Sequence, residues 1–294
     1  MVRPGLALVV AAALAACKSD TEPKAAPPAP PAATHAADAA PPPAALPPFS
    51  VHPTARAALE AMLARVQPRV LGVGEVHVIQ GGPAVRSALA RFTDDMDVLK
   101  GRATDLVVET WVTDGRCGEE EKQATAQVKQ DTERPPEVED ELTRLLKKGK
   151  ELALRPHVLH MTCDHYKSLR ADSGEVDYDK LLQLLGSELL ATSRKALGAR
   201  KGKGLVIVYG GSLHNDRAPG EGVAAYSYGV KLAEELGRGY VELDLYVPEL
   251  IADDAVLRAE PWWPLTEKAG PGQVVLVERG PDSYIMLMQR GVRP

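Results

Sequence analysis

The sequence predicts an α/β fold with a mostly parallel central sheet, helices on both of its faces and an antiparallel hairpin at the C-terminal end. First, apolar runs of strand length alternate with amphipathic helical stretches, which is the order typical of parallel sheets. Second, the runs within 105–109 and 205–209 are continuously apolar, as in strands that are covered on both faces. Third, the last two expected strands, 273–279 and 283–289, are joined by a Gly-Pro-Asp turn that favours a hairpin.

The other elements follow from hydrophobic periodicity and from residues that start and stop helices. Apolar residues recur at helical spacing in four stretches. Pro83 suits the first turn of the second helix, and Gly101 suits its end. The expected helices cover 53–66, 83–99, 178–196 and 226–236, and the further expected strands cover 69–73, 156–161 and 240–247.

The stretch 114–150 is highly charged and locally repetitive. Pro135 and Pro136 interrupt it, so we expect a helical hairpin with a break at the prolines. A charge run of this kind is typical of a solvated face, and it predicts no chemistry.

Residues 1–17 have the pattern of a lipoprotein signal peptide. Arg3 is positively charged, 6–13 form a short apolar run, and the small residues before Cys17 match a cleavage site. The run is too short to span a membrane as a helix. We expect Cys17 to be lipidated and to become the mature N-terminus. The alternative is an ordinary secreted protein in which this cysteine occurs by chance.

Residues 18–49 consist mainly of Ala and Pro and predict an extended, disordered tether. The remainder, 50–294, has the length of a single α/β domain. We therefore expect a protein of the bacterial cell envelope that is held by lipid, in the outer membrane. The net charge of −5 argues against nucleic acid as a partner, because binding phosphates needs a basic face.

Two cysteines remain after the expected anchor, Cys117 and Cys163. An even pair in an exported protein favours a disulfide. The alternatives are two free buried thiols, or a metal site formed by Cys163 with His160 and His165.

Ionisable residues follow several of the expected strands. Glu75 and His77 come after the expected strand at 69–73. Glu109 ends the strand at 105–109, and His214 follows the strand at 205–209. Because ligands in open α/β sheets bind at the carboxyl ends of the strands, we expect these side chains to share one pocket. His165 follows a further strand in the same way.

Two kinds of chemistry need these residue types. Paired carboxylates and imidazoles can move protons, since a carboxylate orients the imidazole and supports its charged form. Neutral histidines with a carboxylate also suit Zn, Mn or Fe, and Glu75, His77 and His214 are the candidate ligands. A structural network of ion pairs is the alternative, because it can imitate an active site.

These segments resemble the ChaN-like haem-binding lipoproteins, a family grouped with the Tiki/TraB proteins and the erythromycin esterases. The resemblance runs through the Gly-Glu-x-His element at Glu75 and His77, the glutamate at 109, and the Gly-Gly-Ser-Leu-His segment that ends at His214. It implies that these residues line one pocket. The esterase and Tiki members imply hydrolysis by activated water, and the ChaN branch implies haem binding.

The favoured hypothesis is a hydrolase-like site that acts on a small molecule or a peptide. Glu75 or Glu109 would be the base, and His77 and His214 would be proton carriers or metal ligands.

Two other hypotheses stay open. In a haem carrier, His165, Tyr166 or Met161 could be the axial ligand, and Trp262-Trp263 could line the slot or simply pack at the edge of the domain. The last hypothesis is an envelope interaction protein without catalytic activity.

Overall fold

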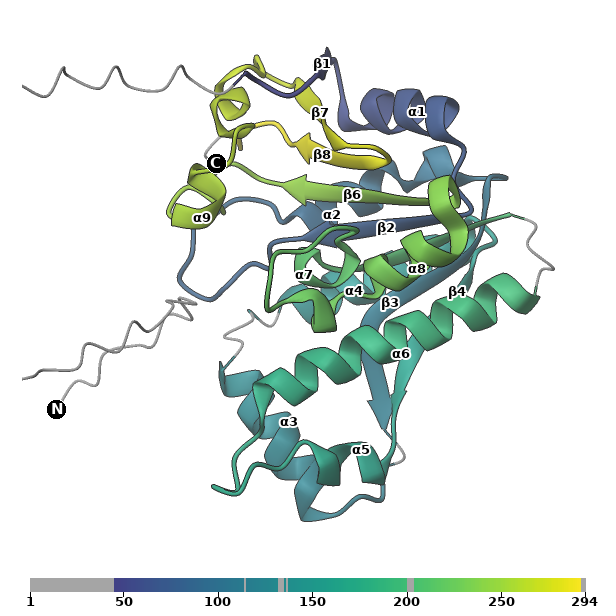
Figure 1. The fold of residues 1–294 in the computed structure, drawn as a ribbon, viewed down its shortest axis with the longest axis vertical. Coiled ribbons are helices and arrows are strands. Elements are labelled where there is room, and N and C mark those ends of the chain that lie inside the picture. Colours follow the sequence, from purple (N-terminus) through teal and green to yellow (C-terminus); the bar gives the residue numbers. More distant parts are fainter. Residues whose placement is uncertain (1–44, 114, 132–134, 136, 200–203, 292–294) are drawn as a thin grey trace, which may run out of the picture. The chain divides into compact units, whose positions relative to one another are not determined.

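The fold is described from a computed structural model, shown in Figure 1. It describes residues 45–291 except 114, 132–134, 136 and 200–203. These described residues form one compact unit. The expected signal peptide with Cys17 and most of the expected tether lie outside the described residues, so these two remain predictions.

The described chain forms one eight-stranded sheet in the order β1-β7-β8-β6-β2-β5-β3-β4. Its inner strands run parallel, whereas the β7–β8 hairpin and the β1–β7 pair at one edge are antiparallel. This confirms the predicted fold class. The strands are β1 (Phe49–His52), β2 (Val70–Glu75), β3 (Ala103–Thr113), β4 (Arg155–Met161), β5 (Leu205–Gly211), β6 (Tyr240–Tyr246), β7 (Val274–Gly280) and β8 (Ser283–Leu287).

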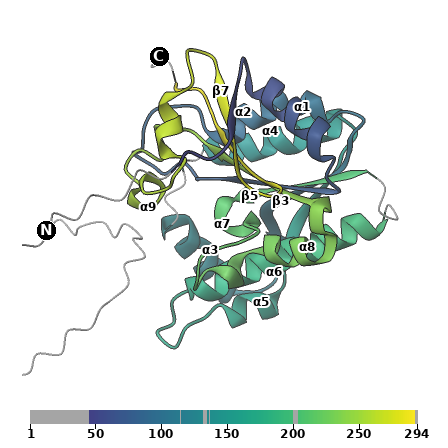
Figure 2. The same cartoon turned by 45° about the horizontal axis from the view of Figure 1, so that its top comes forward.

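Helices cover both faces of the sheet, as Figure 2 shows. α1, α2 and α4 pack on one face around buried side chains such as Leu59 and Phe92, and α6 and α8 pack on the other around Leu189 and Leu232. The helices are α1 (Ala55–Val66), α2 (Ala88–Asp95), α3 (Glu119–Asp131), α4 (Glu137–Glu151), α5 (Cys163–Ser168), α6 (Tyr178–Ala199), α7 (Ser212–Asn215), α8 (Tyr228–Leu236) and α9 (Ala255–Arg258).

The helix expected from Pro83 begins later, at Ala88. Ser87 is its N-cap, and its side-chain oxygen accepts a hydrogen bond from the backbone N–H of Ala90 at 2.9 Å. A serine cap satisfies one of the free N–H groups at a helix start. The prediction from Pro83 was wrong because it placed the proline in the first turn and overlooked this cap.

The charged stretch is helical, as expected, but α4 is not merely a solvated surface. Leu145 is fully buried, and a Cβ on Gly149 would come within 2.9 Å of Leu106 on β3. Glu141 on the same helix accepts a hydrogen bond of 2.6 Å from Ser87. α4 therefore belongs to the layer that covers the sheet.

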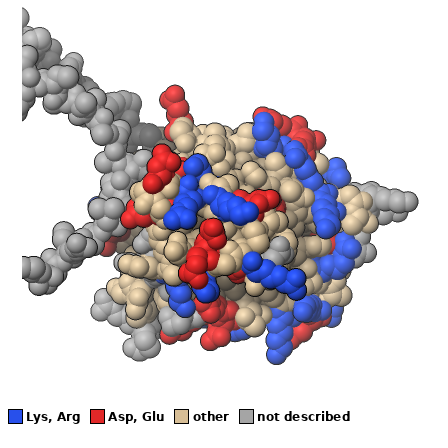
Figure 3. Space-filling model, turned by 90° about the horizontal axis from the view of Figure 1, so that it is seen from below, with Lys and Arg blue, Asp and Glu red and all other residues tan. Residues whose placement is uncertain are grey.

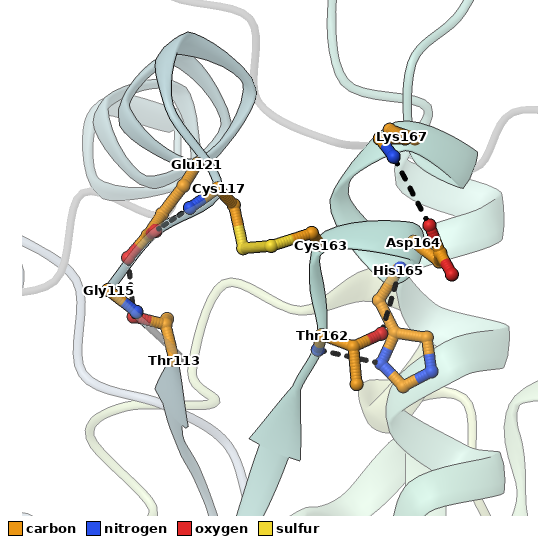
Figure 4. The surroundings of a disulfide bond; sticks show 9 residues. All are labelled: Thr113, Gly115, Cys117, Glu121, Thr162, Cys163, Asp164, His165 and Lys167. Atoms are coloured by element: carbon orange, nitrogen blue, oxygen red, sulfur yellow. Dashed lines mark hydrogen bonds and ion pairs between the residues drawn. A yellow bond between two sulfur atoms is a disulfide. The ribbon is translucent and has the colours of Figure 1, made fainter.

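A disulfide joins Cys117, just before α3, to Cys163 at the start of α5, as drawn in Figure 4. Glu121 accepts the backbone N–H of Cys117 at 3.2 Å, so the cysteine is also held by the helix that follows it. The structure thus contains the expected disulfide. The free-thiol and metal-ligand alternatives are not formed, since Cys163 is bridged and Nδ1 of His165 accepts the N–H of Thr162.

Two further observations concern the helices and the surface. None of the described helices has the length and apolar character that crossing a membrane requires. On the face shown in Figure 3, basic and acidic side chains are intermixed.

We predict that replacing both bridged cysteines, Cys117→Ser and Cys163→Ser, lowers the free energy of unfolding by about 2–4 kcal/mol. The bridge closes a loop between residues 46 positions apart, and losing it enlarges the unfolded ensemble. Urea unfolding with and without reductant measures the effect. Reduced wild-type protein is the control and should match the double variant; equal stability of the variant and oxidised wild type would contradict the prediction.

Candidate functional site

The carboxyl end of β2 carries a buried carboxylate that is bonded on both oxygens. Oε1 of Glu75 lies 3.2 Å from Nδ1 of His77, and Oε2 accepts the backbone N–H of Leu89 at 3.0 Å. Leu89 is in the first turn of α2, where the helix dipole stabilises negative charge. Glu75 is 5% exposed, whereas the side chain of His77 is 31% exposed. His77 therefore links a buried acid to solvent.

A β-bulge in β3 determines where Glu109 points. Val108 lies opposite Val158 on β4, but the next paired residue, Trp111, lies opposite Leu159, so Glu109 and its neighbour are extra residues. Bulges next to active sites commonly redirect a side chain. Here the Glu109 carboxylate accepts the backbone N–H of Gly211 at 2.6 Å.

His214 lies in α7, directly after β5, and its ring is oriented by the short turn that precedes α8. Nδ1 is 2.8 Å from the carbonyl oxygen of Tyr226. Because a carbonyl can only accept, Nδ1 carries the proton in this bond. Nε2 then faces Oε1 of Glu109 at 3.9 Å. His214 is 3% exposed, so this second pair of carboxylate and imidazole is almost dry.

Two glycines make room for these groups. A Cβ on Gly210 would stand 2.9 Å from Cβ of Glu109, too close for any side chain. A Cβ on Gly211 would stand 3.0 Å from Nε2 of His77 and 3.6 Å from Oε2 of Glu109. Gly211 is also the register partner of Glu75 in the β2–β5 pair. The structure therefore brings the four expected side chains, Glu75, His77, Glu109 and His214, together around Gly211.

This arrangement suits proton transfer. Each of two carboxylates lies beside an imidazole, and burial of the carboxylates strengthens those interactions because little water screens them. The Nε2 atom of His77 and a Glu109 oxygen both lie near one point beside Gly211. A water molecule or a substrate atom at that point would have an acid and a base within reach.

Tyr209 belongs to the same neighbourhood, although the sequence predicted it only as part of a strand. Its ring packs against Phe92 with centroids 5.3 Å apart, and its hydroxyl has no hydrogen bond of normal geometry. Burial, followed by the nearby charge of Glu75, raises the pKa of Tyr209 well above its usual value of 10.0. The hydroxyl therefore stays protonated and can only be a neutral donor or acceptor.

Asp244 on β6 is a buried acid that the sequence analysis did not single out. It is 1% exposed, and Nδ2 of Asn215 donates to its Oδ1 at 3.0 Å. Burial, together with the charge of Asp216, raises the pKa of Asp244 to about 7. The available signal was a pair of acids, Glu242 and Asp244, within the expected strand 240–247.

The three expected haem ligands lie elsewhere. Met161 at the end of β4 is fully buried in the apolar core. His165 forms the capping box at the start of α5 with Thr162, and Tyr166 is 3% exposed within the core around α5 and α6. Trp262 is likewise buried and stacks on Tyr246 at 5.3 Å, which corresponds to the packing alternative for the Trp pair. In this structure these side chains serve capping and packing, and haem binding stays a prediction.

The expected metal ligands do not form a ligand set. The Glu75 carboxylate is hydrogen-bonded to His77 and to the backbone N–H of Leu89, while His214 faces Glu109. Within the described part of the chain, no three His, Cys, Asp or Glu side chains are grouped so that they could hold a metal ion. Metal assistance by Zn, Mn or Fe stays a prediction from the sequence.

Comparisons with known proteins add little. No family model and no curated protein matches the chain. The solved structure of the type III effector HopBA1 is similar at 11% identity and a TM-score of 0.43, covering 79% of this chain and 92% of that chain. A Bacillus cereus protein is similar at 12% identity and a TM-score of 0.39, covering 79% and 90%. Likenesses this distant carry no inference about the site.

We predict that Gly210→Ala lowers the free energy of unfolding by about 1–3 kcal/mol, because the new methyl group overpacks the space that Glu109 occupies. Gly198→Ala in α6 is the matched control. A Cβ there meets nothing within 4 Å, so this change should be neutral or stabilise by up to about 1 kcal/mol. Urea unfolding compares them, and equal effects would contradict the packing described here.

We also predict a pH-dependent difference between wild type and Asp244→Asn. The pKa of Asp244 is raised in the folded chain, so the folded state binds this proton more tightly than the unfolded state. Wild type should therefore gain stability relative to the variant as the pH falls from about 8 to about 5. Unfolding curves across this range measure the difference, and a constant difference would contradict the prediction.

Proposed function

We propose that this protein is a hydrolase, esterase-like or peptidase-like, that works at the bacterial envelope on a small molecule or a peptide. The observation that carries the proposal is the meeting of two carboxylate–imidazole pairs around Gly211. Burying several ionisable groups together costs free energy, and such clusters are more frequent in functional sites than elsewhere.

The proposed reaction starts with a water molecule beside Gly211. Glu109 accepts a proton from this water as its oxygen attacks the carbonyl carbon of the substrate. His77 then donates a proton from Nε2 to the leaving oxygen or nitrogen while the bond from that atom to the carbonyl carbon breaks. Glu75 stabilises the protonated ring of His77 from the other side, through Nδ1.

His214 has a supporting part in this scheme. Its Nε2 faces the Oε1 atom of Glu109, while Oε2 of Glu109 is held by the N–H of Gly211. A second imidazole beside the base can take the proton from Glu109 after the attack and so restore the carboxylate. The resemblance to the erythromycin esterase and Tiki group agrees with this chemistry, and the expected lipid anchor at Cys17 agrees with an envelope location.

We predict that His77→Ala and Glu109→Gln each lower kcat by about 10²–10⁴-fold, the usual contribution of a positioned acid or base. Full-length protein is assayed with p-nitrophenyl esters of short and medium chain length and with peptide p-nitroanilides. His52→Ala, on edge strand β1, is the control and should keep wild-type turnover. Turnover that is unchanged in both site variants would refute the proposed roles.

The same preparation tests the haem alternative. Hemin is added, and a Soret shift that His165→Ala or Tyr166→Phe abolishes would support a haem carrier. Wild-type protein that turns over none of the substrates and gives no Soret shift would favour the interaction protein.

A further inference from the structure

Asn215 connects the helix that carries His214 to the centre of the sheet. α7 has only four residues and ends at Asn215. The Asn215 side chain donates to Oδ1 of Asp244 on β6 at 3.0 Å and to the carbonyl oxygen of Gly72 on β2 at 3.4 Å. The hydroxyl of Tyr240 donates to its backbone oxygen. The residue next to His214 is therefore bound to two strands.

A hydroxyl and a guanidinium group also lie beside Asp244. Its Oδ2 lies 3.4 Å from the hydroxyl of Tyr246 and 3.4 Å from a guanidinium nitrogen of Arg279. Arg279 also pairs with Glu242 on β6 and with Asp216, which follows α7. One guanidinium thus faces three carboxylates, so the Asp244 charge is only partly compensated by Arg279. Of the partners named here, the amide of Asn215 lies at the shortest distance from Asp244.

The contact lies directly beneath the proposed site. A Cβ on Gly74 would stand 2.5 Å from Oδ1 of Asn215 and 2.7 Å from Oδ1 of Asp244. Gly74 precedes Glu75 in the chain, and Asn215 follows His214. Oδ1 of Asn215 is buried and has no hydrogen-bond donor, so the amide is held through Nδ2 alone. Loss of the acceptor on Asp244 would leave the amide with the weaker 3.4 Å contact to Gly72.

We propose that Asp244 is a positioning residue: through Asn215 it fixes α7, and thereby the orientation of the His214 ring toward Glu109. This inference adds a residue to the proposed function, and any effect of Asp244 on catalysis rests on that function. The link is indirect, since Asp244 bonds to Asn215 and the ring of His214 is bonded to Tyr226 and faces Glu109. Partners that orient a working side chain commonly matter for activity although they touch no substrate.

The test uses Asp244→Ala, which removes the acceptor of the Asn215 amide, with Glu242→Ala as the matched control. Both changes remove one carboxylate charge from β6 and from the Arg279 cluster, but only Asp244 bonds to Asn215. The readout is the ring signals of His214 in the nitrogen–proton spectrum of full-length protein labelled with ¹⁵N-histidine, assigned with His214→Gln. Asp244→Ala should shift these signals and speed exchange of the Nδ1 proton, whereas Glu242→Ala should leave them as in wild type.

A second variant and an activity measurement complete the test. Asn215→Ala breaks the same link from the other side and should change the His214 signals in the same way, even where Asp244→Ala does not fold. If the hydrolase assay is positive, both variants should lower kcat about tenfold while KM stays within about twofold. Unchanged His214 signals in both variants overturn the inference. Altered signals in a protein without turnover keep the inference about positioning and reject the proposed function.

Discussion

The site depends on the register of three parallel strands. β5 lies between β2 and β3, so its two terminal glycines face Glu75 on one side and Glu109 on the other. A shift of one residue in a parallel pair moves every side chain to the opposite face. The glycines add a second condition, because side chains at 210 and 211 would occupy the space of the carboxylate and the imidazole. Register and empty space together determine which acids and bases can meet.

The same region shows how hydrogen-bond donors compensate the charges of the buried carboxylates. Glu75 has two donors, one from His77 and one from the start of α2. Glu109 has a backbone donor from Gly211, and an imidazole lies nearby. Hydrogen bonds of this kind make burial of a carboxylate tolerable. The exposed part of the cluster is the ring of His77. This one side chain can therefore exchange protons with solvent and pass them to the buried carboxylates.

The layered architecture and the convergence of Glu75, His77, Glu109 and His214 followed from periodicity and from the rule that strand ends share an edge. The finer placement did not. The bulge that aims Glu109 was not predicted, because the expected strand ended at Glu109, whereas β3 continues past the bulge to Thr113. Asp244 was overlooked because its partner Asn215 is 29 residues away, and only the folded chain brings the two side chains together. The contribution of α4 was misjudged because charge dominates its sequence while two positions, Leu145 and Gly149, make its contact with the sheet.

A backbone group donates the 2.6 Å hydrogen bond to Glu109, and this affects how the protein can change over time. The N–H of residue 211 does not depend on the side chains around it, and only a proline at 211 would remove it. Residues near this bond can therefore change during evolution, and the molecules that the site accepts can change with them, while the carboxylate keeps its donor. A site built on a peptide group in this way is a durable starting point for new specificities.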